Sequence, residues 1–217
     1  MPSSNVAPSA RGVSLSRAAR TVWLLGLTQI IGFGAVYYCF AILAKDISHE
    51  FGWSQAQFFG CVSLGLAAGG LTASFAGQAF DRYGAANLMT VGSILMSVAL
   101  VGAAWAPNGV LFAIALVVAN IVSTLVLYDA AFTSLVQLSP LDGSRRIVYL
   151  TLIAGFASSI FWPLTTTLNE NFGWRTTLLM FAVVKLALQA ITINTKIPIA
   201  ITELIFVFII CLLGYFY

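Results

Sequence analysis

The sequence consists almost entirely of long apolar stretches separated by short polar connectors. A helix needs roughly 20 consecutive, mostly apolar residues to cross a hydrocarbon core of about 30 Å, and this chain supplies one such stretch after another. Charged residues make up only 8% of the chain, against about 25% in soluble domains, which is too few to build a water-facing surface. The sequence therefore predicts an all-α protein embedded in a lipid bilayer.

The polar connectors divide the chain into predicted membrane spans. Residues 1–20 are basic and rich in Ser and Ala, and the apolar stretch after them is too long for the core of a signal peptide, so we expect it to stay as the first helix. Residues 195–217 remain apolar but change from Ala/Gly/Leu-rich to Ile/Thr/Phe-rich. They are either a seventh helix or a foreign tail left by a frameshift or truncation, and the change in composition favours the tail. Between these ends we expect a six-helix bundle over residues 21–194. Its spans are 21–44, 54–80, 86–106, 110–138, 147–169 and 174–194.

The positions of Lys and Arg predict the orientation, because short cytoplasmic loops are enriched in both residues. With the N-terminus in the cytoplasm, only Lys45 and Arg175 fall on the outer side. We therefore expect a multi-pass protein of the cell's inner (plasma) membrane with a cytoplasmic N-terminus. Lys185 lies inside the sixth span, and we expect its side chain to reach the cytoplasmic interface by snorkelling. The cytoplasmic connectors hold Arg11, Arg17, Arg20, Arg82, Arg145, Arg146 and Lys196.

The sequence offers little chemistry for catalysis. It contains no nucleophile elbow, HExxH motif or phosphate-binding glycine loop, so we do not expect an enzyme. The basic residues are scattered among connectors, which argues against nucleic-acid binding. Three cysteines, Cys39, Cys61 and Cys211, have neither disulfide nor zinc spacing and are expected to pack as thiols. His49, in a predicted outer loop, is the single histidine, so we expect neither a metal site nor a cofactor.

Gly65 and Gly69 form a GxxxG pattern in the second span, among many Ala and Ser residues. Small residues at this spacing let two helix backbones approach closely inside a membrane. A static helix contact is the favoured interpretation, and a moving transport interface would use the same residues.

The connector between the second and third spans carries the most specific motif. It reads Gly-Gln-Ala-Phe-Asp-Arg-Tyr-Gly over residues 77–84 and predicts a tight loop with an Asp-Arg pair. This connector resembles the loop between helices two and three of the major facilitator superfamily, whose pattern is G-x-L-A-D-R-x-G followed by two basic residues. Ala79 stands where Leu is usual, and Ala85 and Ala86 replace the basic pair. The matching residues are Gly77, Asp81, Arg82 and Gly84.

Two outer-loop motifs extend the resemblance. Phe-Gly-Trp-Ser (51–54) and Phe-Gly-Trp-Arg (172–175) look like bacterial members near the monocarboxylate and oxalate/formate branch, and Arg145-Arg146 lies in the connector between spans four and five. The resemblance implies two six-helix bundles, each made of inverted three-helix repeats, with solute bound between the bundles and exposed alternately to either side of the membrane. Only the N-terminal bundle is expected in this chain.

The function implied by the resemblance is secondary active transport of a small organic solute, with a monocarboxylate and coupled protons as the favoured case. The partners would be the lipid bilayer, the solute, and either a missing C-terminal bundle or a second copy of the chain. The alternative is a helical membrane protein that does not transport, a relic, or a half-size subunit that needs a partner bundle.

Asp129, next to Tyr128 in the fourth span, is the strongest candidate for a functional side chain. A carboxylate inside a membrane helix is costly and usually marks a proton carrier or a substrate contact. The other interpretation is structural, because Asp129 lies in the later half of its helix, where it could pair with a basic residue at the cytoplasmic edge. The basic residues in question are Arg82, Arg145 and Arg146.

Three further polar residues are predicted at the depth of a transport cavity. Gln29 and Tyr37 are eight residues apart in the first span and so share a helical face, and Asn120 lies in the fourth span. The alternative roles are an interface anchor for the tyrosine and a helix-to-helix hydrogen bond for the amides. Pro163 in the fifth span lacks a backbone N–H and is expected to kink its helix.

Overall fold

The computed structural model describes residues 25–127, 130–133, 136 and 143–193, and all the regular structure in these residues is helical. The predicted segments 1–20 and 195–217 lie outside the described residues. The fold class expected from the sequence, an all-α membrane protein, is confirmed. Its elements are η1 (Gly34–Tyr38), α2 (Cys39–Phe51), α3 (Gln55–Tyr83), α4 (Ala85–Ala104), α5 (Gly109–Ser123), α7 (Gly143–Gly155) and α8 (Ala157–Ile193).

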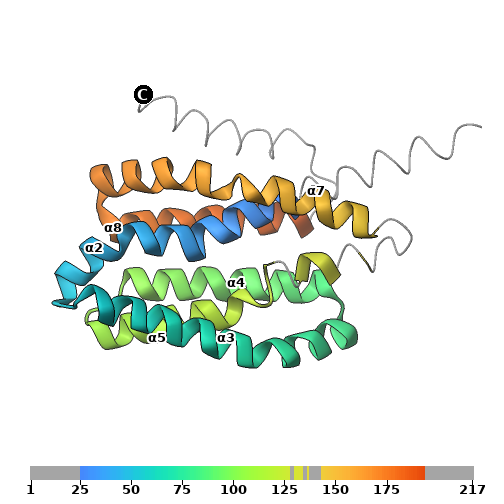
Figure 1. Ribbon diagram of the computed structural model, residues 1–217, viewed down its shortest axis with the longest axis horizontal. Helices are drawn as coiled ribbons and strands as arrows, with labels where there is room; N and C mark the ends of the chain where they lie inside the picture. The colour runs from blue at the N-terminus through green and yellow to red at the C-terminus, as the bar shows by residue number, and fades with distance from the viewer. Residues whose placement is uncertain (1–24, 128–129, 134–135, 137–142, 194–217) are drawn as a thin grey trace, which may run out of the picture.

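The described residues make six membrane passes. Four helices are long and apolar enough to cross a bilayer, and the shorter apolar helix Gly109–Ser123 adds another pass. The longest of the four reverses direction at Gly173, where φ is +76°, so it contributes two passes (Figure 1). By length and composition this part of the chain is a multi-pass membrane protein. The four long helices are Leu25–Phe51, Gln55–Tyr83, Asn87–Ala104 and Ser144–Leu188.

Side-chain caps and glycines set several helix ends. Ser54 begins α3 with a capping box, because its hydroxyl accepts from the Gln57 N–H while the Gln57 side chain accepts from the Ser54 N–H. Asn108 caps α5 by accepting from the N–H of Leu111. Gly52 ends α2 in the left-handed region, with φ of +67°.

Two predicted boundaries were wrong. The first helix runs to Phe51 and not to residue 44, because no turn-forming residue interrupts it before Gly52. His49 therefore lies on the exposed last turn of α2 and not in a loop. The helix α7 begins at Gly143, so Arg145 and Arg146 occupy its first turn and not a connector.

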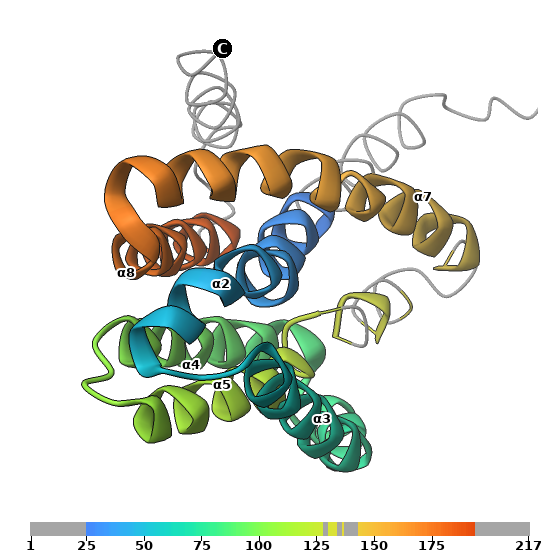
Figure 2. The same ribbon diagram turned by 60° about the vertical axis from the view of Figure 1, so that its left-hand side comes forward.

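The first pass lies at the centre of the bundle. Figure 2 shows it between α8 on one side and α4 on the other, and α4 also packs along α8 and α5. Ile31, Leu43 and Phe112 are completely buried in the main apolar core around it. The outer face of α3, in contrast, exposes Leu71 and Phe75 by more than two thirds, as expected for side chains that meet lipid or another apolar surface.

The GxxxG pattern is a helix contact, as favoured from the sequence. A Cβ atom on Gly65 would lie 3.0 Å from the Cβ of Asn120, and one on Gly69 would lie 3.0 Å from the Asn120 carbonyl oxygen. The glycines thus admit the backbone of α5 against α3. Gly70, one residue further, faces open space.

We predict that Gly69→Leu separates α3 from α5 and lowers the thermal stability of the purified protein in detergent. Overpacking of this kind costs typically about 1–3 kcal/mol. The matched control is Gly70→Leu, which adds the same side chain where nothing lies within 4 Å. Equal melting temperatures for the two variants would contradict the contact.

Candidate functional site

The fourth pass is interrupted in its middle, although the sequence predicts a continuous span over 110–138. The helix α5 ends at Ser123, and residues 124–127 form tight turns in which the N–H groups of Thr124, Leu125 and Val126 donate to carbonyls three residues earlier. Helix resumes at 130–133. The side chains of Ser123 and Thr124 donate to the carbonyls of Asn120 and Ile121, 2.6 and 2.8 Å away, and such local bonds compete with helical ones.

Side chains of the first pass meet this break. Gln29 is completely buried, and its Nε2 donates to the carbonyl oxygen of Val126 at 3.1 Å. The hydroxyl of Tyr37 lies 3.4 Å from the Oγ of Ser123. Both residues therefore reach the fourth pass from the first. The Oε1 atom of Gln29 is buried without a hydrogen-bond partner, which leaves one strong acceptor unused next to the break.

The first pass is itself irregular beside the break. Residues Gly34–Tyr38 form a π-helix, a rare conformation that is frequent at functional sites. Gly34 lies directly against the ring of Phe161 in α8, where a Cβ atom would clash. The widened turn brings Tyr37 to Ser123 while keeping the backbone packed against α8.

Asn120 lies one turn before the break and is also buried. Its Nδ2 donates to the carbonyl of Leu116 in its own helix at 2.9 Å, and its Oδ1 has no partner. Among the described residues, the amide of Asn120 thus makes no helix-to-helix hydrogen bond. Asn120 and Gln29 each carry a buried carbonyl oxygen without a hydrogen-bond partner.

Lys185 contradicts the prediction that its side chain snorkels to the cytoplasmic interface. The residue is only 2% exposed, and its Nζ lies 3.3 Å from the position that a Cβ atom on Gly32 would take. The helix packs this face against the first pass, so the side chain points into the bundle and not along the lipid surface. Gly32 has no side chain, which makes room for the amine.

Asp129 and Tyr128 lie outside the described residues. They follow directly on Leu127, the last described residue of the break. The pairing of Asp129 with Arg82, Arg145 or Arg146 stays a prediction, and so does its role in transport.

The Asp-Arg motif forms a helix end and not a loop. Asp81 and Arg82 belong to the last turn of α3, and Gly84, with φ of +81°, is the single residue that links α3 to α4. Only glycine adopts this φ readily, so a one-residue link requires it. The guanidinium of Arg82 lies over the ring of Tyr83, 5.4 Å from its centroid. Among the described residues, Asp81 forms no ion pair.

A pocket adjoins this motif at the C-terminal end of α3. Its volume is about 450 Å³, and Gly77 of the motif lies in its wall together with residues of the fourth pass. The pocket does not include Gln29, Tyr37 or Asn120. Its lining residues are Ala73, Ser74, Gly77, Phe80, Phe132 and Thr133.

Pro163 lies inside α8, and the kink expected there stays a prediction. The helix α8 continues through Pro163, and the carbonyl of Pro163 accepts from the hydroxyl of Thr167 at 2.9 Å. An interruption falls at Phe156, between α7 and α8, where the Phe156 N–H donates to the carbonyl of Ile153. Phe156 thus lies on the N-terminal side of Pro163. On that side of a proline, the helix loses a backbone hydrogen bond and the proline ring crowds the preceding turn.

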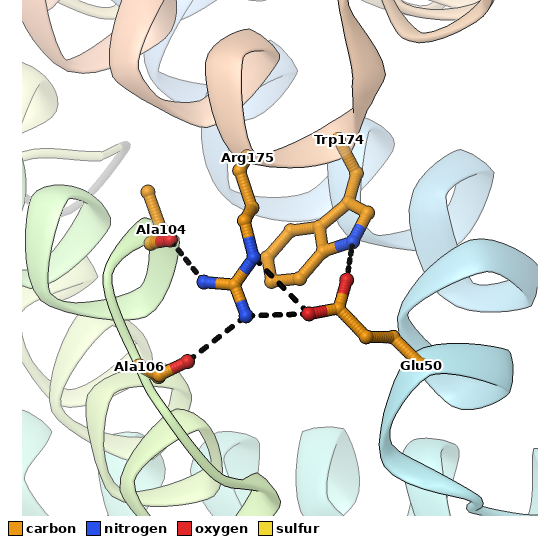
Figure 3. A network of polar contacts seen from close by, with 5 residues as sticks. All are labelled: Glu50, Ala104, Ala106, Trp174 and Arg175. Carbon is orange, nitrogen blue, oxygen red and sulfur yellow. Dashed lines mark hydrogen bonds and ion pairs between the residues drawn. The ribbon is translucent and has the colours of Figure 1, made fainter.

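Arg175 joins the ends of three helical hairpins, as Figure 3 shows. Its guanidinium donates to Glu50 Oε1, with Nη2 at 2.6 Å and Nε at 3.2 Å, and to the carbonyl oxygens of Ala104 and Ala106. The indole of Trp174 donates to Glu50 Oε2 at 2.7 Å. Sequence reasoning noted the two Phe-Gly-Trp motifs but not that these residues meet. We call this set of five residues the outer cap.

Aromatic rings pack beneath the outer cap. Phe112 of α5 is completely buried and lies 5.5 to 6.4 Å, centroid to centroid, from five other rings. The guanidinium of Arg175 covers Trp174 at 4.4 Å from its ring centroid. The partners of Phe112 are Phe40, Phe51, Trp53, Phe58 and Trp174.

We predict that Arg175→Met destabilises the protein more than Glu50→Gln does. The Glu50 ion pair is partly exposed and contributes about 0–1 kcal/mol, whereas losing Arg175 also leaves the carbonyls of Ala104 and Ala106 without their donor, at about 1–3 kcal/mol. Melting temperatures in detergent measure the difference, with the exposed Lys45→Met as control. An equal or smaller effect of Arg175→Met would refute the role of the two carbonyls.

A second pair of variants tests the break. We predict that Gln29→Leu costs about 1–3 kcal/mol, because the carbonyl of Val126 loses its buried donor. Tyr37→Phe removes only a long, partly buried hydrogen bond and should cost under about 1 kcal/mol. Thermal unfolding of both variants provides the comparison, and a smaller loss for Gln29→Leu than for Tyr37→Phe would show that the Val126 carbonyl does not depend on Gln29.

Comparison with protein families gives one match. The family model described as Major Facilitator Superfamily matches residues 23–198, which include all six passes and the Gly77 to Gly84 motif. A search of curated proteins finds no match to the chain.

Proposed function

Because the chain belongs to the major facilitator superfamily, whose members are transporters, we propose that it is the N-terminal bundle of a secondary active transporter for a small organic solute. Alternating access in this family takes place between two bundles, with the solute bound near the middle of the membrane. Catalysis of a chemical reaction forms no part of the proposal.

The observation that carries the proposal is the break in the fourth pass. Irregular backbone at membrane depth is tolerated only where it is buried in protein or lines a cavity, and interrupted helices commonly form the solute sites of transporters. Here the break is met by Gln29 and Tyr37 and is followed at once by Tyr128 and Asp129. We propose these residues, with Asn120, as the N-terminal half of the solute site.

Asp129 is proposed as the proton carrier of this site. A carboxylate next to a break can exchange protons with water that enters the cavity. The motifs at 51–54 and 172–175 support a monocarboxylate as the solute. The second half of the site would come from a C-terminal bundle or from a second copy of the chain, which would cover apolar side chains such as Leu71 and Phe75 that α3 exposes.

The charge distribution supports a cytoplasmic N-terminus in the inner membrane. Figure 1 shows the α2 to α3 connection and the reversal in α8 at one end of the bundle, with the α3 to α4 link and the start of α7 at the other. Lys45 and Arg175 thus lie toward the first end, and Arg82, Arg145 and Arg146 toward the second. Positive charge therefore gathers at the end proposed to be cytoplasmic.

Reconstitution into liposomes tests the proposal. We expect the protein to take up a radiolabelled monocarboxylate when the outer buffer is acidified, and we expect Asp129→Asn to reduce uptake to the level of empty liposomes. The exchange of charges in Asp129→Arg with Arg82→Asp separates the two roles. Recovery of uptake in the double variant indicates a structural latch, whereas continued loss indicates a proton or solute role. Absence of uptake over a panel of monocarboxylates, with the folded protein present, would contradict the proposal.

A further inference from the structure

Lys185 is a basic side chain held inside the bundle, and neither the family nor the proposed site accounts for it. It lies about 16 Å along its helix from Trp174 of the outer cap, at 1.5 Å per residue. This is roughly half of a 30 Å hydrocarbon core. The side chain is 2% exposed and points to the backbone at Gly32. Burying a charged amine without a partner is costly, so such residues are rare and usually functional.

No counter-charge for Lys185 is found in the described part of the bundle. The elements packed against its helix are η1, α2, α4 and α7, and neither α4 nor the neighbouring α5 contains an acid or a base. In the first pass, Tyr37 turns to Ser123 and Cys39 donates to the carbonyl of Ala35. The remaining charged or titratable groups in these elements and in α7 and α8 are Tyr38, Lys45, Asp46, His49, Glu50, Arg145, Arg146, Tyr149, Glu170 and Arg175.

A buried acceptor without a partner lies on the neighbouring turn of the first pass. Gln29 lies one helical turn from Gly32 on the same side of the first pass, and its Oε1 is buried without a partner. Leu127, at the end of the break, also packs against Gly32, with its Cδ2 at 2.8 Å from the position of an added Cβ. Lys185 and the end of the break thus meet at Gly32, one helical turn from Gln29.

We propose that Lys185 is a proton-exchange site inside the bundle, distinct from Asp129. A proton needs no cavity, whereas the packing around Gly32 leaves no room for a solute. In the packing that the structure shows, burial without a counter-charge among the described residues favours the uncharged amine. When α8 and the first pass separate and water enters, the Nζ lone pair accepts a proton from a hydronium ion, which becomes water, and the same step in reverse releases the proton.

The protonation state of Lys185 is open to direct measurement, because the chain contains only three lysines, Lys45, Lys185 and Lys196. In protein labelled with ¹⁵N-lysine and placed in lipid nanodiscs, each Nζ gives one NMR signal, assigned with Lys45→Arg and Lys196→Arg variants. We expect the amine shift from Lys185 in mildly alkaline buffer and its reversible conversion to the ammonium shift on acidification, while Lys45 remains ammonium throughout. An ammonium signal from Lys185 in the same alkaline buffer, or an amine that never converts, overturns the proposal.

Two substitutions provide a second test that depends on stability alone. Methionine matches the length of lysine without its charge, whereas arginine is always charged. We expect Lys185→Met to melt at the wild-type temperature or above it and Lys185→Arg to melt lower. Lys45→Met and Lys45→Arg are the exposed controls. If Lys185 holds a permanent charge against a bound anion, the order of the two Lys185 variants is reversed.

The role of this site in transport rests on the proposed function. In liposomes that contain a pH-sensitive dye, we expect Lys185→Met to abolish solute-driven proton movement while solute binding to the purified variant persists. Unchanged proton movement in Lys185→Met overturns the coupling role. If the wild-type protein moves no solute, the proposed function fails, and the NMR titration still decides whether Lys185 exchanges a proton.

Discussion

The structure depends on the requirement that every backbone polar group inside a membrane find a partner within the protein. Regular helix meets this requirement in most of the six passes. In the fourth pass, residues 124–126 instead donate to carbonyls three residues earlier. Gln29 supplies a donor to the Val126 carbonyl from the neighbouring pass. The break and the buried glutamine therefore depend on each other, and neither would be stable in hydrocarbon alone.

The two ends of the bundle are held differently. At the outer end, Arg175 and Glu50 join three hairpins over a cluster of aromatic rings around Phe112. At the other end, Gly84 alone connects α3 to α4, and a pocket lies between α3 and the fourth pass. The contacts of Arg175 hold three hairpins together at one end, and the break at residues 124–127 lies in the middle of the fourth pass. This arrangement suits a bundle that tilts as one body while the backbone around the break changes conformation.

Much of the fold follows from the sequence because membrane helices are long and strongly apolar. The six passes and the helix contact at Gly65 and Gly69 agree with the expectations. The hydrogen bond of Gln29 to the fourth pass is the helix-to-helix bond considered as its alternative role, and a cavity role for Gln29 and Tyr37 stays a prediction. The break itself carries no Gly or Pro signal. It arises where Ser123 and Thr124 bond to local carbonyls, and such competition depends on neighbours from other helices.

Two other features depend on tertiary contacts that one-dimensional patterns do not contain. Lys185 is buried because Gly32 of another pass makes room for it. Arg175 binds the carbonyls of Ala104 and Ala106 because two hairpin ends meet there. The helical pattern is interrupted at Phe156, seven residues before Pro163. The proposed roles of Asp129 and Tyr128 come from the sequence, and both residues lie outside the described part of the chain.

The central claim is that the break in the fourth pass belongs to a solute site that opens alternately to the two sides of the membrane. Its most direct test is thiol labelling of Thr124→Cys, a half-buried position in the break, in a chain whose three native cysteines are replaced. We predict that a membrane-impermeant thiol reagent reacts with this cysteine in both right-side-out and inverted vesicles, and that solute changes the two rates in opposite directions. Reaction from one side only, unaffected by any solute, would contradict the claim.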